Sequence, residues 1–162
     1  MENTLREAML VALSGENAHV IHVVALEAVT AAQARKRPRR GVATIWEQLA
    51  HMVFWQDIML MRMRGEGTPP VPHDVDGWPK MPPAKGQDVA WDKLVRRFAA
   101  GLNEANRFAK KADLSAKMPK VRRTYADQIL SLATHNSYHT GQIITVRRML
   151  GSWPPPSGGD TW

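Results

Sequence analysis

Apolar side chains recur every three or four positions along most of this chain, the spacing that places them on one face of an α-helix. We expect four such helices, over about residues 4–30, 44–64, 88–111 and 125–150. No stretch alternates apolar and polar residues as a half-buried β-strand does. The pattern therefore predicts an all-α four-helix bundle, formed as a single domain by residues 1–162.

Several predicted helix ends carry capping signals. Thr44 and Glu47 have the spacing of a capping box, in which each side chain binds the backbone N–H of the other residue. Asp88 is the expected cap of the third helix, and Thr124 is that of the fourth. Gly151 follows the last apolar position, as a C-terminal glycine does, and should end the fourth helix.

The segments between the helices differ from them in composition. Gly15 falls inside the first helix, where it costs on the order of 1 kcal/mol relative to alanine, so we expect a kink there. Residues 31–41 turn from alanine-rich to basic and should form a connection with at most a helical turn at its start. Residues 65–86 contain six prolines and four glycines, which excludes a helix or a central strand. Trp78 and Met81 predict that this proline-rich connection crosses the bundle and packs partly on it.

Composition narrows the available chemistry. The 162 residues include no cysteine, which excludes disulfides and thiolate metal sites, so nitrogen and oxygen must hold any metal. No apolar run reaches the roughly 18 residues of a membrane-spanning helix. The first residues also lack the basic and apolar regions of a signal peptide. We therefore expect a soluble, cytoplasmic protein without a membrane partner.

The net charge of +7 is concentrated in one place. Five basic residues form what we call the basic cluster, which consists of Arg35, Lys36, Arg37, Arg39 and Arg40. A solvated turn is the simpler interpretation, and a surface that attracts an anionic partner or cofactor is the alternative. The cluster lacks the interleaved aromatic residues of single-strand binders, and no zinc-finger spacing occurs, so we do not expect a nucleic-acid partner.

The polar centre of the last predicted helix is the strongest functional signal. His135 and His139 are four residues apart, so their imidazoles lie side by side and could share one metal ion; two hydrogen-bonded core histidines are the alternative. His51 lies in the middle of the second helix, which a four-helix bundle packs near the last. Three neutral imidazoles from two helices leave coordination positions for water or substrate, as catalytic zinc sites do. Trp55 and Tyr138 are expected either to line this pocket or to pack in the core.

Three sharper interpretations of a metal site fail on individual residues. A zinc-protease helix needs glutamate after its first histidine, and Asn136 stands there instead. A di-iron bundle needs two Glu-x-x-His motifs, and only Glu16 with His19 has that spacing. An iron site with two histidines and one carboxylate would need Glu47 or Asp57, neither of which is as well placed as the third histidine.

The remaining polar side chains have less specific roles. Gln128 and Gln142 lie one or two turns from the histidine pair on the same helix face and are expected to orient an imidazole or a metal-bound water. His19 and His22 are one turn apart on the first helix, where we expect surface or rim positions. His73 lies in the proline-rich connection, where a solvated loop is expected.

Three segments resemble one known family. Residues 44–52, the sequence His-Asn-Ser-Tyr-His-x-Gly-Gln over residues 135–142, and the Leu-Gly-Ser-Trp-Pro-Pro-Pro ending over residues 150–156 resemble the DinB/YfiT-like superfamily of metal-binding four-helix bundles. The resemblance implies a divalent-metal site whose ligands are His51, His135 and His139. It also implies a homodimer, and better-understood branches of the superfamily are transferases or isomerases that use bacillithiol, mycothiol or glutathione.

We therefore expect a divalent-metal-dependent enzyme, with zinc or nickel as the first candidates for the ion and iron as a further one. The expected reaction is a thiol-linked transfer or isomerisation between a low-molecular-weight thiol and a small-molecule electrophile. A metal-dependent hydrolase is one alternative, because a bound metal lowers the pKa of water as well as that of a thiol. A non-catalytic, metal-stabilised stress-response or binding module is another. The sequence identifies no general base.

Overall fold

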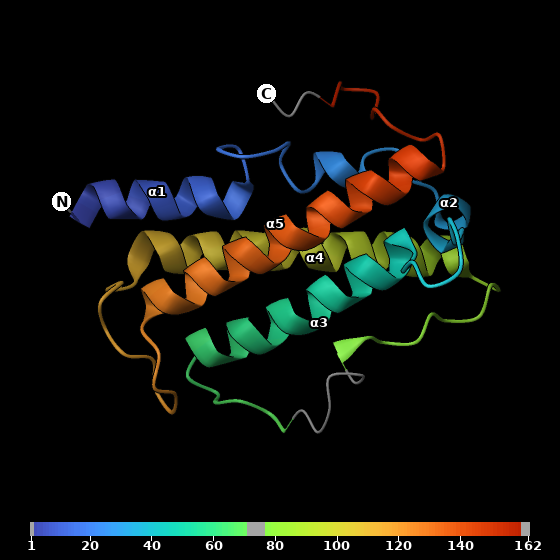
Figure 1. Ribbon diagram of the computed structural model, residues 1–162. Coiled ribbons are helices and arrows are strands. Elements are labelled where there is room, and N and C mark those ends of the chain that lie inside the picture. The colour runs from blue at the N-terminus through green and yellow to red at the C-terminus, as the bar shows by residue number, and fades with distance from the viewer. Residues whose placement is uncertain (1, 71–76, 160–162) are drawn as a thin grey trace.

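Four long helices form the body of the protein (Figure 1). They are α1 (Glu2–Ser14), α3 (Ile45–Met63), α4 (Gln87–Lys111) and α5 (Tyr125–Met149). The computed structural model describes residues 2–70 and 77–159, and within these ranges it contains no β-strand. A short 3₁₀ helix, η1 (Val24–Leu26), and a short helix, α2 (Ala31–Arg35), join α1 to α3. None of the helices described is long and apolar enough to cross a membrane.

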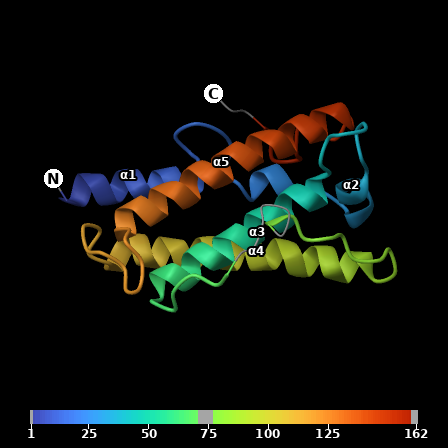
Figure 2. The ribbon, with the colours of Figure 1, turned by 60° about the horizontal axis from the view of Figure 1, so that its bottom comes forward.

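The four long helices pack so that α3 and α1 each contact both α4 and α5. Figure 1 shows that α3 and α4 run in the same direction, whereas α1 and α5 run in the opposite one. Two consecutive parallel helices need a connection that returns along the bundle. In both views residues 77–86 lead back along the bundle to the start of α4 (Figures 1 and 2). The predicted all-α bundle with a long crossing connection is confirmed.

The buried apolar residues form two clusters that meet α5 at different heights. One cluster contains Ile143 and Val146 from α5 together with Leu49 of α3 and Phe98 of α4. The other contains Ile129, Leu132 and Ala133 from α5 with the methionines and alanines of α1, α3 and α4. Between these levels the buried side chains of α5 are polar, namely Asn136, His139 and Thr140. The polar centre of the last helix, which the sequence marks as the candidate functional region, therefore lies at mid-bundle.

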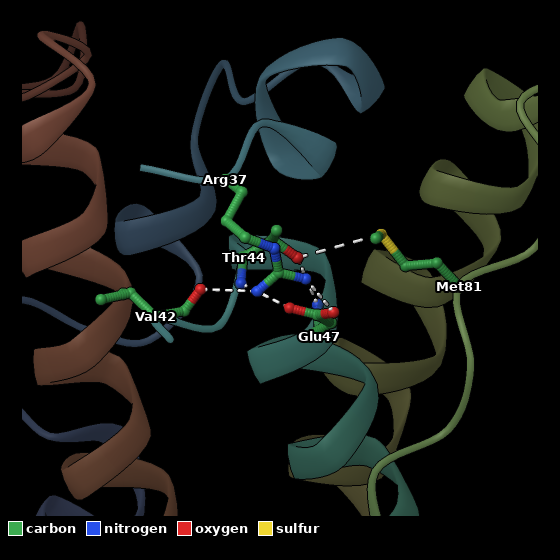
Figure 3. Close-up of polar contacts among 5 residues, drawn as sticks. All are labelled: Arg37, Val42, Thr44, Glu47 and Met81. Carbon is green, nitrogen blue, oxygen red and sulfur yellow. Dashed lines mark hydrogen bonds and ion pairs between the residues drawn. The ribbon is translucent and has the colours of Figure 1, made fainter. Parts of the chain in front are cut away.

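The helix that carries His51 begins at the predicted capping box. Thr44 N–H donates to Oε2 of Glu47 over 2.7 Å, and Glu47 N–H donates to Oγ1 of Thr44 over 3.1 Å (Figure 3). The same reciprocal arrangement starts α5 at Thr124. Gly151 ends α5 at a φ of +69°, which is the left-handed conformation that a C-terminal glycine supplies. These signals are read correctly from sequence because each depends on contacts within one helical turn.

The first helix is shorter than predicted. Gly15 has a φ of +87°, and a Cβ at this position would lie 2.2 Å from Cε1 of the His19 ring. A left-handed residue does not continue an α-helix, so α1 ends at Ser14 and residues 15–23 form turns. The prediction of one kinked helix to residue 30 was wrong, because Gly15 terminates the helix.

The start of α4 also differs from the prediction. The cap is Gly86, with a φ of +74° and no side-chain hydrogen bond, and Asp88 lies inside the first turn. An acidic residue there still interacts favourably with the helix dipole, although it does not cap. The helical turn expected at the start of residues 31–41 is present as α2, which is capped by Thr30.

Candidate metal centre

Three imidazoles meet at the middle of the bundle. His51 comes from α3, and His135 and His139 come from adjacent turns of α5. Nε2 of His135 lies 3.3 Å from Nε2 of His51, and one nitrogen from each ring lies within 4.8 Å of the others. Two nitrogen ligands of a tetrahedral zinc ion, each about 2.0–2.1 Å from it, are roughly 3.3–3.4 Å apart. We call this group, the only one of its kind among the described residues, the three-histidine site.

Hydrogen bonds at Nδ1 set the tautomers of two of the rings. Nδ1 of His51 lies 2.6 Å from the carbonyl oxygen of Gly77. Nδ1 of His139 lies 2.7 Å from Oε1 of Gln48 and 2.7 Å from Oε1 of Gln142. Because these oxygens only accept, each Nδ1 carries the hydrogen and each Nε2 keeps a lone pair. Neutral imidazoles of this tautomer are ready to bind a metal through Nε2.

The three rings are also held in the neutral form. Burial lowers the pKa of His135 to about 4, with a further lowering from the neighbouring histidines. Burial lowers the pKa of His139 to about 4 as well, and it lowers that of His51. A metal ion therefore displaces no proton from these rings near neutral pH, and a divalent cation would be favoured where three imidazolium ions are not.

The proline-rich connection covers one side of the three-histidine site. The indole of Trp78 stacks on the His51 ring, with centroids 4.0 Å apart and planes 17° apart. Gly77 lies so close to Trp55 that a Cβ would be 2.8 Å from its Nε1. Glycine at this position therefore lets the carbonyl of residue 77 reach His51. The predicted packing of this connection against the bundle is confirmed at Trp78, which is 40% exposed.

A groove of about 690 Å³ opens beside the three-histidine site. Two of its lining residues, Gln48 and Gln142, are those that contact His139, and a third, Trp78, is the one that stacks on His51. The volume is within the range of about 300–1,000 Å³ that small-molecule sites occupy. The groove is lined by Gly41, Val42, Ala43, Gln48, Trp78, Tyr138, Gly141, Gln142, Thr145 and Val146.

The residues predicted to surround the site are only partly the right ones. Gln142 contacts His139 as expected, but Gln128 is fully buried and its amide has no hydrogen-bond partner among the described residues. Tyr138 is 65% exposed, so it does not pack in the core, and it lies edge-on to His139. Trp55 is half-buried beside His51 and packs against the second apolar cluster.

Sequence reasoning missed Gln48, Gly77 and Trp78 as neighbours of the histidines. Gln48 had a usable signal, because it precedes His51 by three residues and so shares its helix face. Gly77 and Trp78 had none, since only the path of the proline-rich connection brings them to His51. The contact is not encoded in any local spacing.

The remaining candidate residues lie elsewhere. His22 is 2% exposed, and its Nδ1 lies 2.7 Å from Oγ1 of Thr140, so the predicted surface position was wrong. The turns after Gly15 fold His22 inward against α5, which a continuous helix would not do. Glu47 and Asp57 pair with arginines and do not join the three-histidine site. His73 lies outside the described residues.

The chain is similar in sequence to a known protein family. The model of the DinB superfamily matches residues 21–143. This range contains α2, α3, α4 and all three histidines of the site. The searches of curated proteins and of solved structures found no match.

Proposed function

This chain belongs to the DinB superfamily, and on that premise we propose that it is a divalent-metal-dependent enzyme whose ion is held by His51, His135 and His139. The observation that carries the proposal is the convergence of three neutral imidazoles from two helices within 4.8 Å of one another. Three protein ligands leave further coordination positions for a reactant, which is the arrangement typical of catalytic sites.

The donor set favours a borderline transition metal. Imidazole nitrogen suits zinc, nickel, copper and ferrous iron, and the site offers no thiolate or carboxylate that would select otherwise. Zinc or nickel are our first candidates, and iron is a further one. A bound ion would act as a Lewis acid and lower the pKa of a thiol or water that reaches it.

Neighbouring residues would position the ligands and control access. The carbonyl of Gly77 orients the His51 ring, and the amide oxygens of Gln48 and Gln142 orient His139. The Trp78 indole stacks on one face of the His51 ring. Such partners hold an imidazole in one tautomer and typically change metal affinity by about 10–100-fold.

The proposed reaction is a thiol-linked transfer or isomerisation. A groove of about 690 Å³ beside the site supports a small-molecule substrate, namely a low-molecular-weight thiol and its electrophilic partner. A metal-dependent hydrolase and a non-catalytic, metal-stabilised stress-response module are the alternatives. We further propose a homodimer, which sedimentation of the metal-loaded protein would test against a monomer.

Replacement of a ligand tests the metal site itself. We expect wild-type protein to carry close to one equivalent of transition metal after exposure and desalting, and His135→Ala to carry much less, because two imidazoles bind far more weakly than three. His19→Ala is the matched control, since it removes an imidazole outside the site. Elemental analysis measures both, and equal metal content in the wild type and His135→Ala would remove the basis of the proposal.

The reaction is tested with metal-loaded protein and common cellular thiols. We expect the protein to conjugate glutathione, bacillithiol or mycothiol to 1-chloro-2,4-dinitrobenzene. The absorbance of the thioether product measures the rate. Metal-free protein and His135→Ala should show only the uncatalysed rate. Hydrolysis of p-nitrophenyl acetate without any thiol reaction would favour the hydrolase alternative. No turnover in either assay, with metal bound, would favour the non-catalytic module.

A further inference from the structure

We propose that the groove beside the three-histidine site binds an elongated anionic small molecule with a flat or apolar body, one end of which reaches the histidines while the other reaches Arg39 and Arg40. The inference rests on the proposed function and specifies the class of substrate that the site takes. The lining of the groove, its aromatic residues and the charges around it support this proposal.

The groove adjoins the three-histidine site through residues that contact both. Gln48 and Gln142 line the groove, and the same two amides contact Nδ1 of His139. Trp78 lines it too and stacks on His51. A molecule in the groove therefore touches the groups that hold two of the three imidazoles, and its inner end would lie next to the ion.

Gly141 is the clearest sign that the groove is a binding surface. It lies inside α5, where glycine makes the helix less stable than alanine would. A Cβ at this position would meet no atom within 4 Å, so packing within the protein does not require glycine. Gly141 lines the groove, and the absence of a side chain there widens it. A side chain at position 141 would therefore extend into the open space of the groove.

Two large aromatic side chains remain exposed at the groove. Trp78 is 40% exposed and Tyr138 is 65% exposed. Val42 and Ala43, which are partly exposed, add aliphatic surface to the same lining. Exposed aromatic rings next to an apolar floor are typical of sites that bind a flat or apolar ligand.

The charges favour an anion. The described residues that line the groove include no aspartate or glutamate. The lining of the groove includes Gly41 and Val42, which directly follow Arg39 and Arg40 in the chain. Both arginines are exposed, and neither forms an ion pair within the described residues.

Other members of the basic cluster are engaged in the fold. Arg35 donates to the carbonyl oxygen of Pro82 and lies over the Trp46 ring. Arg37 donates to the Val42 carbonyl over 2.6 Å and to Glu47 over 2.5 Å, and Figure 3 shows this side chain turned toward the start of α3. Of the arginines in the cluster, only Arg39 and Arg40 are thus left for a ligand.

A matched pair of fluorescent probes tests the inference on the metal-loaded protein. 1-Anilinonaphthalene-8-sulfonate is flat and anionic, and N-phenyl-1-naphthylamine has the same rings without the sulfonate. We expect the anionic probe to bind more tightly than the neutral one. Gly141→Leu should weaken both by about tenfold or more, because the added side chain fills the groove. Ala100→Leu is the control, since it adds the same side chain at an exposed position of α4.

Neutralisation of the two arginines tests the anionic end of the proposed ligand separately. The double variant Arg39→Gln/Arg40→Gln should weaken the anionic probe roughly threefold to fivefold and leave the neutral probe unchanged, as expected for exposed ion contacts. Arg96→Gln/Arg107→Gln is the control, because it removes the same net charge from exposed positions of α4. Equal losses in the two double variants would overturn the anionic end of the proposal.

Gly141→Ala should change thermal stability and probe binding in opposite directions. Alanine should raise the melting temperature, because it is the better helix former and meets no neighbour. It should also weaken probe binding. A variant that is more stable and binds unchanged would overturn the proposal, as would probe binding that Gly141→Leu leaves intact. If Gly141→Leu instead changes the association constant of a dimer, the groove is an interface between copies of this chain and the proposal fails.

Failure of this inference can be told apart from failure of the proposed function. Probe binding that responds to Gly141→Leu in protein that takes up no metal would retain the groove and reject the enzyme. Normal metal uptake with probe binding that ignores every groove variant would retain the metal site and reject the groove as its substrate site.

Discussion

Two of the three imidazoles of the three-histidine site are oriented by hydrogen bonds at Nδ1. His51 is bonded to the carbonyl of Gly77, and His139 is bonded to two glutamine side chains from α3 and α5. The lone pairs at Nε2 follow from those bonds and not from the histidines alone. At this scale the chemistry depends on which atom each ring nitrogen faces.

The two glutamines should matter to metal affinity, and a third should not. Gln48→Leu and Gln142→Leu should each weaken metal binding by about tenfold, because His139 loses an oxygen that fixes its tautomer. Gln128→Leu is a matched control, since its buried amide has no partner among the described residues. That variant should bind metal normally and be more stable by about 1–3 kcal/mol. Competition with a chromogenic chelator and urea denaturation measure these effects, and equal affinity losses in all three variants would contradict them.

The histidine pKa values predict how the metal-free protein responds to acid. In the folded protein the pKa of His135 and of His139 is lowered to about 4 from the ordinary 6.5. Between these values the unfolded chain binds protons that the folded chain does not, so the free energy of unfolding should fall as the pH drops from about 6.5 to about 4. Urea denaturation across this range should show a smaller decrease in His135→Asn/His139→Asn. An identical pH dependence in that variant would contradict the assignment.

At the scale of elements, α3 and α5, which carry the three histidines, each start from a defined cap. The Thr44 capping box lies two turns before His51, and the Thr124 capping box starts α5 in the same way. The first helix is interrupted early, because the left-handed conformation of Gly15 ends it. The chain then turns and places His22 against Thr140 of α5.

Gly15 should therefore be far less replaceable than another left-handed glycine. Gly41→Ala should cost about 1–2 kcal/mol, because its φ is +81° but a Cβ there meets nothing within 4 Å. Gly15→Ala should cost more, since its Cβ would also overlap the His19 ring. Urea denaturation gives both free energies of unfolding. Equal costs would show that the His19 ring moves away freely.

For the whole molecule, the three-histidine site brings α3 and α5 together at mid-bundle, in addition to their apolar packing and the hydrogen bond from the Tyr125 hydroxyl to the Met63 carbonyl. The site lies between the two apolar clusters, and the proline-rich connection closes over it through Trp78. Its histidines include His51 and His135, which are 84 residues apart in the chain. A bound ion would therefore act as a crosslink between α3 and α5.

Metal removal should lower the stability of the wild type and leave that of a ligand variant unchanged. A free ion at about 100 times its dissociation constant should raise the free energy of unfolding by about 2.7 kcal/mol, because it binds only the folded state. Thermal or urea denaturation with and without a chelator measures this difference. His135→Ala should show none, and the same chelator effect in that variant would mean that the ion binds elsewhere.

Local sequence patterns were sufficient for most of the fold. The boundaries of α3 and α5 followed from capping residues and apolar spacing, and His51, His135 and His139 were identified as candidates because two of them share a helix face. The prediction of the first helix failed because Gly15 can adopt more than one backbone conformation. Gly15 could have continued a helix, and only its φ of +87° in the folded protein shows that it ends α1.

The amino-acid sequence by itself determined the helices, their caps and the candidate ligands, because these depend on interactions within one or two turns. Only the tertiary structure decided that the three imidazoles meet, that Gly77, Trp78 and Gln48 hold them, and that His22 is buried. Those contacts join residues far apart in the chain. Their geometry is set by the path of the connections and the packing of whole helices, which no local spacing records.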